Sequence, residues 1–219
     1  MVGWSSRRLT GVAVVAVLAS GCVDERAFYI SEIRSPCLTG MVSNGLLDVA
    51  GKEGYRISAI IMNDLLSSTG TDQQPERSRL AVRKFMIKID LGQAGAANAP
   101  SELTDFEIPV SGTITPGGTA EIGYFPVVPA ALVAYLNFPS GHRPMIVATI
   151  QVEAEQNGST VESAEYSFPI ELCSGCLVRD VGGCPTEDDT YTTNSCGLPQ
   201  DEPVTCCTDS VAGFHCLKQ

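Results

Sequence analysis

Apolar and polar residues alternate along three long stretches of the chain, and this alternation predicts β-strands. In residues 80–91 one face carries Ala81, Arg83, Phe85, Ile87, Ile89 and Leu91, and the other carries Val82, Lys84, Met86, Lys88 and Asp90. Residues 146–155 and 164–172 alternate in the same way. Because successive side chains of a strand point to opposite faces, the first stretch from Phe85 onward and the two later stretches are predicted to be half-buried strands with a polar outer face.

Turn residues separate these stretches and set where the strands end. Asn157-Gly158 lies between the last two alternating runs, and both residue types tolerate positive φ, so the pair predicts a hairpin. Weaker strands are predicted at 28–33, 46–49, 55–62, 106–110 and 120–128, with a turn at Thr115-Pro116-Gly117-Gly118. Pro129 suits the start of a short helical turn, and Pro139 prevents its continuation.

Seven or eight short strands in about 150 residues predict an all-β fold built as a two-sheet β-sandwich. The pattern loosely resembles Ig-like sandwiches. The Cys–Trp–Cys hallmark of antibody domains is missing, because the single tryptophan, Trp4, lies near the N-terminus. A jelly roll and a small barrel remain alternatives, and the strand order is left open.

The composition changes at Cys173, where alternation stops and cysteine, glycine, proline and threonine become frequent. Seven cysteines fall in the last 47 residues: Cys173, Cys176, Cys184, Cys196, Cys206, Cys207 and Cys216. A segment this small cannot bury enough apolar surface by itself, so covalent cross-links are its expected support. The sequence therefore predicts a sandwich domain over 22–172 and a small, disulfide-rich, mostly irregular tail over 173–219.

The number of cysteines predicts one disulfide between the tail and the sandwich. Seven is odd, and Cys37 is the one cysteine of the predicted sandwich once Cys22 is set aside. If all eight pair, at least one tail cysteine must reach Cys37. We expect that partner to be Cys173 or Cys176, and we leave the other pairings open because eight cysteines allow 105 connectivities.

The N-terminus has the layout of a secretory signal. Arg7 and Arg8 precede an apolar run over 9–19, about half the length needed to span a membrane. The run ends Leu18-Ala19-Ser20-Gly21-Cys22, which resembles the lipobox of bacterial lipoproteins. The resemblance implies a signal peptide over 1–21, lipid on Cys22 as the mature N-terminus and, from Val23, sorting to the outer membrane. An ordinary signal peptide and a twin-arginine signal are the alternatives.

Charge and cysteine content narrow the class of partner. The 219 residues carry a formal charge of −11, which becomes −13 if residues 1–21 leave, because Arg7 and Arg8 go and all 25 acidic residues stay. No basic patch is available to neutralise phosphates, so a nucleic-acid partner is not expected. Nine cysteines against two histidines favour an oxidising compartment such as the periplasm.

Few residues suggest chemistry, and we expect neither catalysis nor a cofactor or metal. Cys173-x-x-Cys176 has the spacing of a redox dithiol, but no helix is predicted after it. Cys173, Cys176, Cys206, Cys207 and His215 are a conceivable zinc set, and Glu187-Asp188-Asp189 a conceivable calcium loop. Glu153 and Glu155 share the outer face of a strand and are expected to be solubilising charges.

The expected function is that of a membrane-anchored envelope lipoprotein that acts as a non-catalytic binding or structural module. Its expected partners are the membrane, through the N-terminal lipid, and an envelope protein or surface ligand whose identity the sequence does not give. The alternative is an envelope enzyme or redox accessory protein that uses His142 or the Cys173/Cys176 pair, because a loop histidine can serve as a general base.

Overall fold

The computed structural model describes residues 28–65, 78–95, 98–184, 193–210 and 213–217. The predicted signal peptide (1–21), the lipidation candidate Cys22 and the Glu187-Asp188-Asp189 segment lie outside the described residues. The strands are β1 (Phe28–Arg34), β2 (Gly45–Asp48), β3 (Tyr55–Asn63), β4 (Leu80–Asp90), β5 (Asp105–Ile114), β6 (Thr119–Val128), β7 (Met145–Gln156), β8 (Ser159–Glu162), β9 (Tyr166–Cys173), β10 (Val178–Gly183), β11 (Val204–Asp209) and β12 (Gly213–Cys216). The helical elements are η1 (Val49–Gly51), η2 (Ser101–Leu103) and α1 (Ala130–Val133).

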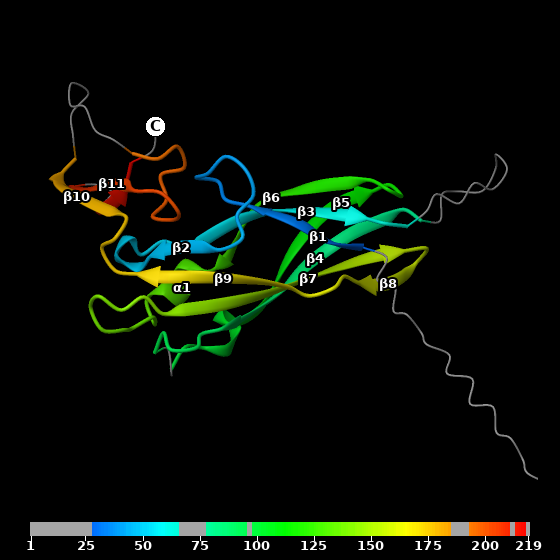
Figure 1. Cartoon of the computed structure of the whole chain (residues 1–219), viewed down its shortest axis with the longest axis horizontal. Helices are drawn as coiled ribbons and strands as arrows, with labels where there is room; N and C mark the ends of the chain where they lie inside the picture. The colour runs from blue at the N-terminus through cyan, green and yellow to red at the C-terminus, as the bar shows by residue number, and fades with distance from the viewer. Residues whose placement is uncertain (1–27, 66–77, 96–97, 185–192, 211–212, 218–219) are drawn as a thin grey trace, which may run out of the picture.

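Two sheets form the predicted all-β sandwich (Figure 1). The smaller sheet has the order β1-β3-β6, and the larger has the order β2-β9-β7-β4-β5, with β8 paired to β7. The neighbours are antiparallel except for β2 and β9, which run parallel. This is an Ig-like arrangement, in which the chain crosses between the two sheets several times: β1, β3 and β6 lie in one sheet, and β2, β4, β5, β7 and β9 lie in the other.

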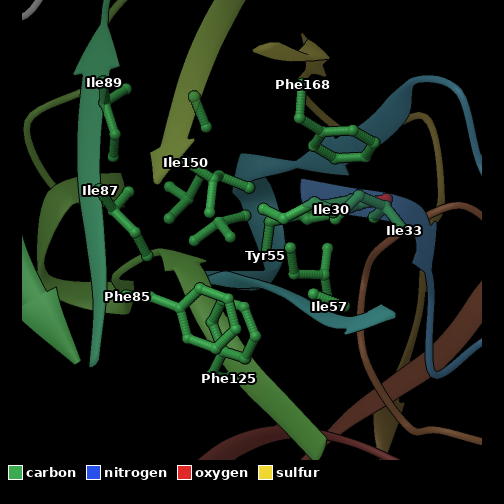
Figure 2. Packing of buried hydrophobic residues seen from close by; sticks show 14 of the residues in the cluster. Ile30, Ile33, Tyr55, Ile57, Phe85, Ile87, Ile89, Phe125, Ile150 and Phe168 are labelled. Carbon is green, nitrogen blue, oxygen red and sulfur yellow. The ribbon is translucent and has the colours of Figure 1, made fainter. Parts of the chain in front are cut away.

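The inward-facing residues of both sheets form one hydrophobic core (Figure 2). Phe85 of β4 stacks on Phe125 of β6 with ring centroids 4.3 Å apart, which joins the two sheets. A second contact between the sheets is that of Tyr55 of β3, whose ring centroid lies 5.8 Å from that of Phe168 of β9. Aromatic pairs of this kind contribute beyond the area that they bury, so they fix how the sheets are placed on each other.

Strand β4 departs from strict alternation at Arg83. Leu80 and Val82 are buried, and after them Phe85, Ile87 and Ile89 are buried. The register shifts between Val82 and Lys84 against both neighbouring strands, which marks a β-bulge. The half-buried strand predicted from Phe85 onward is confirmed. Before Phe85 the extra residue of the bulge reverses the phase of the strand, so that Val82 is buried and Arg83 is exposed.

The predicted hairpin turn at Asn157-Gly158 joins β7 to β8. Both residues have positive φ, 53° and 79°, as a two-residue turn that follows the twist of its strands requires. The strand predicted over 164–172 is β9, which pairs with β7 on the same side as β8 but further along it. The hairpin thus brings two consecutive strands back onto β7.

The tail is more regular than predicted. Strands β10, β11 and β12 form a three-stranded sheet, in which β10 and β11 are parallel and β11 and β12 antiparallel. This sheet lies at the end of the sandwich near β2 and the end of β9 (Figure 1). Among the described residues, no helix is long and apolar enough to cross a membrane.

Candidate functional site at the junction of sandwich and tail

A short segment of the tail pairs with β2 and extends the larger sheet. Gln200 forms a bridge with Leu47, the amide of Asp48 donates to the carbonyl of Pro199, and the amide of Asp201 donates to the carbonyl of Leu46. The tail therefore covers an edge strand whose backbone groups would otherwise face solvent.

Gln200 is a fully buried polar residue with its amide satisfied on both sides. Its Oε1 accepts from the Arg56 amide at 2.9 Å, and its Nε2 donates to the Arg56 carbonyl at 2.9 Å and to Ser35 Oγ at 3.1 Å. A buried amide is tolerated only when it is hydrogen-bonded. Gln200 finds its partners only when the tail is docked on the sandwich, and these hydrogen bonds in turn hold the tail in that position.

The carboxylate of Asp201 accepts two further hydrogen bonds from the sandwich. The Tyr55 hydroxyl lies 2.8 Å and 2.7 Å from its two oxygens, and the Leu46 amide lies 2.9 Å from Oδ1. Burial, and after it the negative charge of Asp201, raise the pKa of Tyr55 far above its usual range. Tyr55 therefore stays protonated and acts as a donor to the tail.

Asp48 is the second anchor between the two parts of the chain. Its side chain is fully buried at the end of β2, and its carboxylate accepts four backbone N–H bonds. The donors are Ala50 at 3.0 Å, Gly175 at 2.7 Å, Leu177 at 2.7 Å and Val178 at 2.9 Å. Hydrogen bonds to a charged acceptor are strong, so Asp48 holds the loop between β9 and β10 in one conformation.

All eight cysteines of the described residues are paired. The pairs are Cys37–Cys196, Cys173–Cys176, Cys184–Cys207 and Cys206–Cys216. The expected bond from Cys37 to Cys173 or Cys176 was wrong. Cys173 ends β9 only three residues before Cys176, and these two pair with each other, whereas Cys196 precedes the segment that docks on β2 and reaches Cys37.

The structure separates the residues that suggested zinc. Cys173 and Cys176 are paired with each other, while Cys206 and Cys207 bond to different partners. His215 instead lies near a sulfur pair that the sequence did not single out, with Nε2 3.9 Å from both Cys184 Sγ and Cys207 Sγ. Its Nδ1 lies 3.1 Å from the Gly213 carbonyl, which can only accept a hydrogen bond, so Nδ1 carries a proton.

The other residues with candidate chemistry lie away from this junction. His142 is exposed in the turn before β7, and its imidazole makes no hydrogen bond to a side chain of the described residues. Glu153 and Glu155 lie on the outer face of β7, where Glu153 pairs with Lys84 at 3.3 Å and Glu155 pairs with Arg83. These two carboxylates are thus engaged in surface ion pairs.

An open pocket lies beside the Asp48 anchor. Its volume is about 470 Å³, and it is lined by Ala50, Lys52, Gly175, Val178, Asp180 and Phe214. The lining combines one cation, one anion and the half-exposed ring of Phe214. Residues from η1, the β9–β10 loop, β10 and β12 thus meet in one concave surface, which exists only because the tail is docked on the sandwich.

Sequence reasoning missed most of this junction. Asp48, Tyr55, Gln200 and Asp201 belong to no recognisable motif, and their contacts join positions up to 165 residues apart. The change of composition at Cys173 and the even number of remaining cysteines were the available signals, and they indicated a linked tail but not its docking site. Comparison of the chain with protein-family models and with curated proteins found no match.

Proposed function

We propose that this chain is a lipid-anchored protein of a bacterial cell envelope, and that it works as a non-catalytic binding or structural module. The observation that carries the proposal is the pairing of the cysteines. Eight of the nine pair with one another, and the one left over is Cys22, the residue in the lipobox-like position. Four disulfides also favour an oxidising compartment outside the cytosol.

The position of β1 supports presentation of the tail away from the membrane. Phe28 pairs with Asn63 at the end of β3, whereas Tyr55 at the start of β3 contacts the tail. Eight steps of about 3.3 Å place these two ends of β3 about 26 Å apart. Five residues separate Cys22 from Phe28, and such a linker spans at most about 20 Å.

Recognition is proposed for the concave surface at the junction, lined by Lys52, Asp180 and Phe214 among others. A half-exposed aromatic ring next to charged groups is typical of contact surfaces, where large side chains supply most of the binding energy. The disulfides and the buried hydrogen bonds fix this surface before any partner arrives. Such preorganisation lowers the entropy lost on binding.

The anchor is tested by expressing the full chain in a bacterial host and comparing wild type with Cys22→Ala. The wild type is expected in the detergent phase of a Triton X-114 extraction, with the mass of residues 22–219 plus acyl groups. The variant is expected to lack the acyl mass and to leave the detergent phase. A wild-type chain without acyl groups would overturn the anchor.

Recognition is tested separately by placing a photo-crosslinking residue at Phe214 or, as a control, at the exposed Tyr124 of β6. Binding through the junction predicts a saturable crosslinked species in intact envelopes from position 214 and none from position 124. Equal crosslinking from the two positions, or none from either, contradicts a recognition surface at the junction.

A further inference from the structure

We propose that Cys173–Cys176 is a thiol–disulfide exchange site, which accepts two electrons from an external dithiol while the other three disulfides stay closed. The proposal is independent of the lipid anchor and of the partner surface. It rests on three features of this pair: the access of solvent to one sulfur, the small size of the ring that the bond closes, and the support that Asp48 gives to the loop.

Access distinguishes Cys176 from the other paired cysteines. Cys176 is exposed, as are Ser174 and Gly175 before it, whereas Cys173 is only 3 % exposed. Each of the remaining six cysteines is buried or half-buried. Exchange begins with attack of a thiolate on an accessible sulfur, so Cys176 Sγ is the favoured target on this molecule.

The ring closed by this disulfide is the smallest of the four. Its cysteines are three positions apart, compared with 10, 23 and 159 for the other pairs. A short loop loses little entropy when it is closed in the unfolded chain, so opening it removes little stability from the fold. Reduction at this site therefore leaves the sandwich and the tail folded.

Asp48 keeps the loop in place whether the disulfide is open or closed. The amides of Gly175, Leu177 and Val178 donate to its carboxylate, and none of these bonds involves sulfur. The two sulfurs consequently remain neighbours after reduction, ready to close again. This is the behaviour expected of an exchangeable pair and not of a disulfide that serves only as a cross-link.

The proposed step balances as follows. An external thiolate attacks Cys176 Sγ, the Cys173–Cys176 bond breaks, and Cys173 leaves as a thiolate that takes a proton from water. The second thiol of the external dithiol then attacks the sulfur of the same dithiol that is bonded to Cys176. The bond to Cys176 Sγ breaks, and Cys176 leaves as a thiol with the proton of the attacking group. The external dithiol is oxidised to a disulfide by two electrons, and the Cys173/Cys176 pair is reduced to two thiols.

The Asp48 carboxylate and the strand after Cys176 determine how stable the reduced form of the pair is. An oxygen of Asp48 and the two sulfurs lie within 4.8 Å of one another, and a negative charge disfavours a neighbouring thiolate. Strand β10 follows Cys176, so no helix dipole offsets this charge. Both effects disfavour the thiolates of the reduced pair, so the pair closes again readily once the external dithiol is removed. The exposure of Cys176 Sγ to an attacking thiolate, and not a high reduction potential, selects this disulfide for opening.

The first test uses native wild-type protein and graded dithiothreitol as the external dithiol, followed by alkylation and peptide mass mapping. Cys173 and Cys176 are expected to be alkylated at reductant concentrations that leave the other six cysteines unmodified, with the thermal midpoint lowered by only a few degrees. Opening of another pair first, or joint opening with Cys37–Cys196, would overturn the proposal.

The second test compares two single variants with oxidised glutathione as the probe. Cys173→Ser leaves the exposed thiol of Cys176, and Cys176→Ser leaves the buried thiol of Cys173. Cys173→Ser is expected to form its mixed disulfide at least tenfold faster than Cys176→Ser. Equal rates would mean that exposure of Cys176 does not direct the exchange, and the assignment of the attacked sulfur would be wrong.

Discussion

The hydroxyl of Tyr55 lies 2.7 Å from Oδ2 of Asp201, a residue 146 positions later in the chain. This bond joins the first residue of β3 to the segment of the tail that pairs with β2. It is one of several contacts that join the tail to the sandwich, and substitution of Tyr55 tests the docking of the tail directly.

Replacing Tyr55 with phenylalanine removes this bond and keeps the ring. Because the acceptor is a carboxylate in a partly buried position, we expect Tyr55→Phe to lower the free energy of unfolding by about 2 kcal/mol. Urea denaturation measures the change. Tyr124→Phe is the control, because Tyr124 is 56 % exposed, and it should change stability by less than about 0.5 kcal/mol. Equal effects of the two variants would show that the Asp201 bond contributes little.

The raised pKa of Tyr55 predicts a loss of stability at alkaline pH. Below about pH 10, the usual tyrosine value, the hydroxyl is protonated in both the folded and the unfolded chain. Above it, the unfolded chain releases the proton and the folded chain retains it, so stability falls by about 1.4 kcal/mol per pH unit. Urea midpoints between pH 9 and 11.5 should fall more steeply for wild type than for Tyr55→Phe. Parallel slopes would contradict the raised pKa.

Asp48 is predicted to contribute more than any exposed acidic residue that caps a turn. In Asp48→Asn an NH2 group replaces one carboxylate oxygen and faces two backbone N–H donors from which it cannot accept, so we expect a loss of about 3 kcal/mol. Asp90→Asn is the matched control, since the Asp90 carboxylate is exposed and, within the part of the chain that the structure describes, accepts only from the Gly92 amide at 3.0 Å. That change should cost less than about 0.5 kcal/mol. Similar losses for the two variants would argue against a special role of Asp48.

The strands could be predicted because alternation and turn residues are patterns of neighbouring positions in the sequence. Alternation located β4, β7 and β9, and Asn157-Gly158 located the hairpin, since positive φ at two successive residues restricts the choice of residue. The bulge at Arg83 has a weaker signal in the sequence. The apolar residues at 80, 82, 85 and 87 are spaced by two, three and two positions, and the spacing of three marks the extra residue. Strand order and the Ig-like pairing depend on contacts between distant strands, and one alternating strand resembles another.

The junction could not be predicted for a related reason. Gln200 and Asp201 are ordinary polar residues in sequence, and their role depends on the Arg56 backbone and the Tyr55 hydroxyl that meet them in the fold. Cysteine parity correctly required a bond from Cys37 to the tail, but it carries no distance information. The choice among tail cysteines is made by the docking of the segment after Cys196 on β2, and this docking has no local signal.

The disulfide from Cys37 to Cys196 is predicted to stabilise the fold more than the Cys173–Cys176 bond does. It closes a loop of 159 residues, compared with three for the other pair, and the chain-entropy model gives about 5 kcal/mol against about 2 kcal/mol. The double variants Cys37→Ser/Cys196→Ser and Cys173→Ser/Cys176→Ser avoid free thiols at the site of each change. Urea midpoints should therefore fall much further for the first than for the second. If the Cys173→Ser/Cys176→Ser chain were the less stable, the short bond would have to be a structural cross-link, because its removal would then cost more than loop entropy allows.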